Sequence, residues 1–305
     1  MKQPTVVALG FFDGVHLGHA ALLQSARTQA DALGIPAVAM TFDIHPDELI
    51  RGVTVPLLHS REDRQQYLKR YGIDEVVFLP FDRDMMRMPW EQFLDEYLIG
   101  TLQASCLVCG YDYRFGYRGE GTVGKLAKAC KDRGLGCKVI EKVEINGETV
   151  SSTHIRQLIT DGKVAKARQF LGYAPSLHGE VIHGSGLGRT MGTPTANLQV
   201  SPEILLPKKG VYISLAHTLQ GSFPAVTNIG CRPTVNGAGL SVEAWLLDYS
   251  GELYGKTVRL ALYEFLRPEQ RFDTLSELRE EILHNAQQTR AYFSHAPWRD
   301  LHALP

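Results

Sequence analysis

The chain has 305 residues, enough for two domains that each bury their own core. It is 44 % hydrophobic and 21 % charged, with a formal net charge of −1, which is the composition of a soluble globular protein. No global electrostatic field recruits a nucleic acid or an anionic membrane, so we expect neither partner, and an anionic ligand has to be held locally.

The N-terminus and the cysteines favour a cytoplasmic protein. The chain begins with a strand-like apolar segment that lacks the features of a signal peptide, and no window approaches the roughly 18 apolar residues of a membrane helix. Five scattered cysteines favour reduced thiols. Cys106 and Cys109 form a CxxC, but no second pair supplies the other zinc ligands, so a buried strand is the better interpretation of this apolar run.

The first half of the chain alternates strand-like and helix-like segments. Strands are predicted over residues 5–9, 37–42, 75–79, 106–109 and 138–140, and helices over 19–33, 61–70, 90–99 and 124–133. Buried strands separated by helices predict a Rossmann-like α/β domain with a parallel sheet covered on both faces.

The second half has a different pattern. From Leu177 onward, short β-branched and aromatic runs are separated by Gly, Pro and Asn turns, which predicts a small antiparallel β-barrel. An amphipathic helix over about 275–292 closes the chain. The change lies near Gly172, so we predict domains of residues 1–175 and 176–305.

The segment after the first strand has the features of a mononucleotide site. Gly10, Gly14 and Gly18 let the backbone approach a phosphate at a helix N-terminus. His16 and His19 lie three residues apart on the first helical turn, so they can face one phosphate together and stabilise charge during nucleotidyl transfer. This HxGH pattern resembles the nucleotidyltransferase superfamily.

Three hydroxyls and an arginine precede a second helix. Ser151, Ser152 and Thr153 can cap that helix and bind phosphate, and Arg156 offers a bidentate guanidinium. Asp112 and Arg114 follow a predicted strand, where they either bind a substrate or serve a turn; the residues alone leave both open. The P-loop-like segment 119–126 is rejected, because its last residue is leucine rather than Ser or Thr.

The densest cluster of the second half is a glycine-rich loop followed by Pro-Thr-Ala-Asn. The amides of Gly184, Gly188 and Gly192 can surround a polyphosphate beside Arg189. Thr195 and Asn197 alternate, so they share one face of a strand and offer the oxygen ligands that Mg²⁺ prefers. Glu243 lies among apolar strand residues, either as a structural carboxylate or as a catalytic base.

Taken together, the chain resembles the bacterial bifunctional riboflavin kinase / FAD synthetase family over nearly its whole length. The matching stretches are GFFDGVHLGH, TFDIHPDEL, GYDYRFG, SSTHIR, GLGRTMGTPTANL, GVYIS, TNIGCRPT, VEAWLLD, LYGK and FLRPEQRFDTLSELREEI. The resemblance implies that an N-terminal FMN adenylyltransferase domain adenylylates FMN to FAD with release of pyrophosphate. It implies that a C-terminal six-stranded barrel phosphorylates riboflavin to FMN. Each reaction consumes ATP.

The resemblance assigns roles to particular residues. His16, His19 and Glu243 are the implied catalytic residues, with Glu243 deprotonating the riboflavin 5′-hydroxyl. Thr195 and Asn197 are implied to hold Mg-ATP. Arg267 and Phe272 fall in the segment that family members use near the flavin, and the resemblance implies that Ser152, Thr153 and Arg156 lie around ATP and the FMN phosphate. With the candidates taken from the residues themselves, the predicted flavin-binding residues are Asp112, Arg114, Arg267 and Phe272. The predicted ATP-binding residues are Gly10, Phe11, Gly14, Gly18, Ser151, Ser152, Thr153, Arg156, Gly184, Gly188, Arg189 and Gly192.

The chain departs from the family pattern at a few positions. His154 stands where the family usually has Arg, and a neutral imidazole supplies less positive charge to a phosphate than a guanidinium does. Trp245 stands where the family usually has His. Activity in only one half is therefore one alternative, and a non-catalytic flavin carrier is another. The chain retains two candidate metal ligands, Thr195 and Asn197, and a candidate base, Glu243. Flavin binding alone does not require these residues, which argues against the carrier. We expect a monomer or a weak homo-oligomer.

Overall fold

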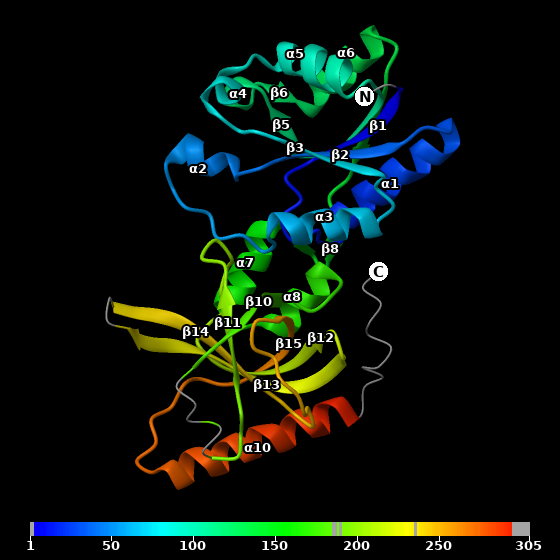
Figure 1. The fold of residues 1–305 in the computed structure, drawn as a ribbon. Helices are drawn as coiled ribbons and strands as arrows, with labels where there is room; N and C mark the ends of the chain where they lie inside the picture. Colours follow the sequence, from blue (N-terminus) through cyan, green and yellow to red (C-terminus); the bar gives the residue numbers. More distant parts are fainter. Residues whose placement is uncertain (1–2, 185–187, 189–190, 235–236, 295–305) are drawn as a thin grey trace. The chain divides into compact units, whose positions relative to one another are not determined.

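The computed structural model describes residues 3–184, 188, 191–234 and 237–294, with backbone alone for 231–234 and 237–240 (Figure 1). The chain forms two compact units, the first up to Ser152 and the second from Thr153 onward. Helices α7 (Ser152–Thr160) and α8 (Val164–Leu171) thus fall almost wholly in the second unit. The predicted boundary after residue 175 follows these helices and stays a prediction.

The first unit is built on a five-stranded parallel sheet, as predicted. Its strands are β1 (Thr5–Leu9), β2 (Ala37–Phe42), β3 (Glu75–Leu79), β4 (Ala104–Gly110) and β7 (Gly136–Ile140), in the order β3-β2-β1-β4-β7. All neighbouring pairs run parallel. The chain continues from β1 to β2 on one side of this pair and from β4 to β7 on the other. The carboxyl ends of β1 and β4 are therefore the topological switch point, where such sheets bind ligands.

Helices cover both faces of this sheet (Figure 1). Val7, Leu9 and Leu107 pack on one face with Leu98 of the π-helix η1 (Phe93–Thr101) and Leu126 of α6 (Val123–Asp132). Helices α1 (Leu17–Leu33) and α3 (Arg61–Arg70) lie on the other side of the sheet. The predicted helix 90–99 is thus a short α5 (Trp90–Gln92) continued as a π-helix.

Several short elements escaped sequence analysis because two to six residues show no usable periodicity. They are α2 (Pro46–Arg51), α4 (Arg83–Arg87), the 3₁₀ turn η2 (Tyr117–Gly119), and the hairpins β5 (Arg114–Phe115) with β6 (Gly121–Thr122) and β8 (Glu144–Ile145) with β9 (Glu148–Thr149). The P-loop-like segment contains β6, which is antiparallel to β5, so it does not follow a parallel strand. Cys106 and Cys109 are buried in β4, as predicted.

The second unit contains a closed barrel of six antiparallel strands. They are β10 (Ser176–Ile182), β11 (Ala196–Val200), β12 (Gly210–Thr218), β13 (Gly221–Thr234), β14 (Gly237–Leu246) and β15 (Thr257–Arg267), in the order β10-β11-β14-β13-β12-β15. Helix α10 (Leu275–Ser294) packs Phe293 against Leu215 and Tyr263 of the barrel. The predicted fold class is confirmed. Within the described residues, no helix is long and apolar enough to cross a membrane.

Candidate active sites

The first candidate site lies where β1 ends. The turn after Gly10 contains left-handed residues, with φ of 59° at Phe12 and 78° at Gly14. Phe12 and Asp13 are almost fully buried. The Asp13 carboxylate accepts hydrogen bonds from the backbone N–H groups of Leu58 (2.9 and 3.0 Å) and His59 (3.1 Å). A distant segment therefore holds this turn in a conformation that is uncommon for residues other than glycine.

The two histidines of the HxGH pattern lie together at the start of α1, as predicted. His16 is the N-cap residue, and its Nδ1 accepts a hydrogen bond from the His19 backbone N–H at 3.2 Å. The two rings stack with centroids 3.7 Å apart and planes 11° apart. The Nδ1 atom of His19 is buried without a hydrogen-bond partner among the described residues. A phosphate oxygen would supply the missing partner.

The environment of His19 disfavours its protonated form. Burial lowers the pKa of this imidazole well below its ordinary value, and the neighbouring His16 and His59 lower it further. His19 is therefore neutral at pH 7 in the ligand-free protein. A polyanion placed against the ring would have the opposite effect and favour the imidazolium.

The lowered pKa of His19 predicts that the first unit loses stability in acid. Because the unfolded chain takes up this proton near its ordinary pKa of 6.5 and the folded unit does not, the free energy of unfolding falls as the pH drops below about 6.5. Thermal unfolding of the wild type and of His19→Asn, from about pH 7.5 to about pH 5, tests this. We expect the steeper loss in the wild type, and equal slopes would contradict the assignment.

The Ser-Ser-Thr motif reaches the same turn in part. The Ser152 hydroxyl donates to the backbone carbonyl of Asp13 at 2.9 Å, so it is bound to the turn after β1. Thr153 and Arg156 belong to the second unit, and their roles at the phosphate, like that of Ser151, stay predictions. The His154 ring packs against Phe170 of α8, with centroids 4.8 Å apart. At this position, where the family usually has Arg, the side chain contributes to helix packing.

Asp112 and Arg114 follow β4 at the same edge of the sheet as Gly10, because parallel β1 and β4 end together. Both are exposed, and Arg114 donates a long hydrogen bond, 3.4 Å, to the Gly119 carbonyl. Their position at the switch point agrees with a substrate contact, and their flavin role stays a prediction.

The second candidate site is a row of polar residues across three strands of the barrel. The register places Glu243 of β14 directly opposite Asn197 of β11 and opposite Asn228 of β13. Directly paired residues point to the same face of a sheet, so the carboxylate lies between two side-chain amides. Sequence analysis identified Asn197 and Glu243 but missed Asn228. The TNIG stretch was noticed only as part of the resemblance.

Two described glycines of the glycine-rich segment lie against the predicted metal ligands. A Cβ atom at Gly184 would overlap the side-chain amide of Asn197, and one at Gly188 would approach the Thr195 Oγ1 atom at 3.3 Å. Gly192 has a φ of 75°. Arg189 lies outside the described residues. The structure therefore brings Gly184, Gly188, Thr195 and Asn197 together, and their roles stay predictions.

Substituting Gly184 with alanine is expected to reduce riboflavin phosphorylation by about ten-fold or more, because the added methyl displaces the Asn197 amide. Initial rates of FMN formation at varied ATP measure the effect. Gly124→Ala is the matched control, since a Cβ at Gly124 meets nothing within 4 Å. Unchanged FMN formation in Gly184→Ala would show that Asn197 is not needed where the structure places it.

A cavity of about 300 Å³ contains both the predicted base and the predicted flavin residues. Glu243, Trp245, Arg267 and Phe272 line it, together with Asn228 and Thr195. The Arg267 guanidinium lies 5.7 Å from the Phe272 ring centroid. Its Nε atom is 2.8 Å from a carboxylate oxygen of Glu281 and donates to the Asn285 Oδ1 atom at 3.1 Å. Helix α10 thereby orients Arg267.

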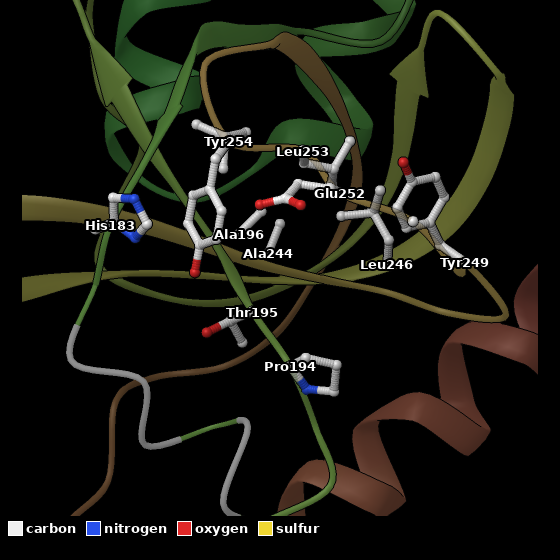
Figure 2. A pocket seen from close by; sticks show the side chains of 12 residues that line it. His183, Pro194, Thr195, Ala196, Ala244, Leu246, Tyr249, Glu252, Leu253 and Tyr254 are labelled. Atoms are coloured by element: carbon white, nitrogen blue, oxygen red, sulfur yellow. The ribbon is translucent and has the colours of Figure 1, made fainter.

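A second, larger cavity of about 610 Å³ shares Thr195 with the first (Figure 2). The rings of His183 and Tyr254 stack beside it, with centroids 3.9 Å apart. Its apolar lining includes Ala196 and Ala244, which are direct partners in the β11–β14 register. Sequence analysis did not find this cavity, although Tyr254 falls in the LYGK stretch that carries part of the resemblance.

Thr195, which lines both cavities, and Asn197, two residues further along the chain, fit a metal ion that is shared with a nucleotide. Thr195 and Asn197 offer a hydroxyl and an amide oxygen, which suit Mg²⁺ with its remaining ligands from phosphates and water. The described residues contain no group of three or more His, Cys, Asp and Glu side chains placed to hold a metal.

Comparison with known proteins assigns the two units. Residues 1–154 match the family model described as FAD synthetase, and residues 171–293 match the one described as riboflavin kinase. The bifunctional riboflavin kinase/FMN adenylyltransferase of Listeria monocytogenes is 35 % identical over 95 % of this chain and 92 % of its own. The chain belongs to the bifunctional riboflavin kinase/FMN adenylyltransferase family. The predicted resemblance, activities and enzyme class are confirmed at this level.

Two further relatives support the assignment over the full length. The family member of Escherichia coli K12 is 35 % identical over 96 % of this chain and 94 % of its own. A solved structure described as a macrolide-efflux protein from Streptococcus pneumoniae is 30 % identical, with a TM-score of 0.88 over 95 % of both chains. Its description concerns that protein, and the likeness shows that the fold is shared over both units.

Proposed function

We propose that the second unit phosphorylates riboflavin with the 300 Å³ cavity holding the flavin and the 610 Å³ cavity holding ATP. The observation that carries this proposal is the row formed by Asn197, Glu243 and Asn228. Glu243 and Asn228 of this row line the smaller cavity, and Thr195 lines both cavities. A hydroxyl group in the smaller cavity and a γ-phosphate from the larger one would meet beside Glu243 and Thr195.

In this proposal Glu243 accepts the proton of the riboflavin 5′-hydroxyl as the oxygen attacks the γ-phosphorus. The bond between the γ-phosphorus and the β–γ bridging oxygen breaks, and ADP leaves with the electron pair. Arg267, Phe272 and Trp245 orient the flavin. The amides of Gly184 and Gly188 and the oxygens of Thr195 and Asn197 bind the polyphosphate. Mg²⁺ bound there would neutralise charge on the transferring phosphoryl group.

The first unit is proposed to transfer an adenylyl group to FMN at the end of β1. The phosphate of FMN attacks the α-phosphorus of ATP, the bond to the β-phosphate oxygen breaks, and pyrophosphate leaves. His16, His19 and the N-terminus of α1 stabilise the charge that develops on the α-phosphate oxygens. Ser151, Ser152, Thr153 and Arg156 are proposed to bind the phosphates, and Asp112 and Arg114 the flavin.

A cytoplasmic monomer or weak homo-oligomer is also part of the proposal. Support comes from Cys106, Cys109, Cys130 and Cys137, all of which are free thiols in the structure. Burial raises the pKa of Cys109 to about 12, which keeps this thiol protonated and unreactive. No nucleic acid or membrane partner is proposed.

The purified chain is tested with riboflavin, Mg²⁺ and ATP, and the flavins are separated by chromatography. We expect FMN first and then FAD. FMN that accumulates without FAD would overturn the adenylyl-transfer assignment of the first unit, and bound but unconverted riboflavin would identify a carrier. Supplying FMN directly tests the first unit alone.

A further inference from the structure

Arg64 of α3 is a fully buried arginine at the adenylyl-transfer site that the mechanism above does not use. Only 1 % of the residue is exposed. Its guanidinium keeps a positive charge at any accessible pH, and removing such a charge from water is costly unless its donors are satisfied. The groups that contact the Arg64 guanidinium therefore indicate its role.

The guanidinium of Arg64 binds backbone carbonyls at the carboxyl ends of two neighbouring strands. Its Nη1 atom donates to the carbonyl oxygen of Phe11, just beyond β1, at 3.1 Å, and to that of Phe42, the last residue of β2, at 3.3 Å. A longer contact of 3.5 Å joins Nη2 to the Asp43 carbonyl. The Thr41 hydroxyl also donates to the Phe11 carbonyl, at 2.9 Å.

Two aromatic rings bound the same guanidinium. Its central carbon lies 4.4 Å from the ring centroid of Phe11 and 5.4 Å from that of Phe78, in β3. Arg64 thus contacts the ends of β1, β2 and β3, which are neighbours in the sheet. A planar group with five donors suits this task better than the compact ammonium of lysine.

These carbonyls lie at the edge of the sheet where a nucleotide triphosphate is proposed to bind. Carbonyl oxygens carry partial negative charge, which repels a polyphosphate in a partly buried site. Arg64 offsets that charge and also fixes the backbone of Phe11, one of the predicted ATP-binding residues. Both effects act on ATP binding before any bond is made or broken.

We propose that Arg64 is a positioning residue for adenylyl transfer, which holds the turn after β1 and screens its carbonyl oxygens from the phosphates of ATP. The proposal rests on the proposed function of the first unit. It predicts that loss of the guanidinium weakens ATP binding in the FMN-to-FAD reaction. Riboflavin phosphorylation, in the second unit, is an internal control for enzyme concentration and for the folding of that unit.

The test compares Arg64→Met and Arg64→Lys in the full chain, with FMN as the flavin and ATP varied. We expect Arg64→Met to raise the KM for ATP about ten-fold or more, with kcat within about three-fold of the wild type. Arg64→Lys keeps the charge without the planar fork, so the KM should rise only about two- to five-fold. Arg61→Met is the matched control, because exposed Arg61 of the same helix lies 4.3 Å from the Phe78 ring centroid but donates no hydrogen bond to these carbonyls among the described residues.

The outcomes separate positioning from a merely structural role. If Arg64 only stabilises the fold, FAD formation falls with the folded fraction, the KM for ATP stays constant, and lysine rescues nothing; that result overturns the proposal. Should Arg64→Met fail to fold, Arg64→Lys decides, since an unchanged KM contradicts the proposal as well. Failure of the wild type to convert FMN would instead overturn the proposed function itself.

Discussion

Replacing Glu243 with glutamine is expected to abolish riboflavin phosphorylation and to leave the conversion of FMN to FAD intact. Glutamine keeps the size and the hydrogen-bonding carbonyl of the side chain but cannot accept the proton of the riboflavin hydroxyl. General-base catalysis contributes about 10²- to 10⁴-fold, so we expect kcat for FMN formation to fall by about that factor. Time courses with riboflavin or with FMN as substrate measure the two activities separately.

The neighbours of Glu243 explain why the effect should be on chemistry rather than folding. Its carboxylate lies between Asn197 and Asn228 in the strand register and lines the 300 Å³ cavity. Glutamine can still pair with both amides. Glu264→Gln, at an exposed position of β15, is the matched control and should retain full activity. FMN formation within about three-fold of the wild type in Glu243→Gln would assign the base elsewhere.

Replacing His19 with asparagine should have the opposite selectivity, with loss of FAD formation and normal FMN formation. The substitution removes an imidazole that is proposed to donate to the transferring phosphate, and removal of one such donor costs about 10²- to 10³-fold in kcat. His19 stacks on His16 at the start of α1, and its buried Nδ1 atom has no hydrogen-bond partner among the described residues. Release of pyrophosphate from FMN and ATP measures this step.

His284→Asn provides the control for the histidine substitution, because His284 is exposed on α10. It should leave both reactions within about two-fold of the wild type. If His19→Asn lowers both FMN and FAD formation equally, the residue supports folding and not transfer. If FAD formation persists in His19→Asn, the charge is stabilised by other groups.

The sequence was sufficient to predict the main strands and the helices that follow them. Strands β1, β2, β3 and β4 are continuous apolar runs, the pattern of buried parallel strands. The pairing of His16 with His19 was also predictable, because an N-cap side chain lies next to the residue three positions later, whatever the rest of the chain does. Two-residue strands such as β5 are too short to show a hydrophobic period, so their sequence does not predict them.

The kinase site was predictable only in its parts. Thr195 and Asn197 share a strand face by local alternation, but their position opposite Glu243 depends on the register between β11 and β14, which packing across the whole barrel sets. Asn228 joins the same row through a third strand, far away in sequence. The cavity beside His183 and Tyr254 likewise requires barrel closure.

The sequence by itself therefore determined the local features. These are the periodicity of strands and helices, the glycines of the candidate phosphate-binding turns, and the chemical types of the candidate reactive side chains. The tertiary structure decided which of these side chains meet. Arg64 shows the difference, since an arginine in a polar helix has the pattern of a solvated residue until the fold buries it against the carbonyls of Phe11 and Phe42. Contacts between distant segments depend on packing and strand register, and no local pattern encodes them.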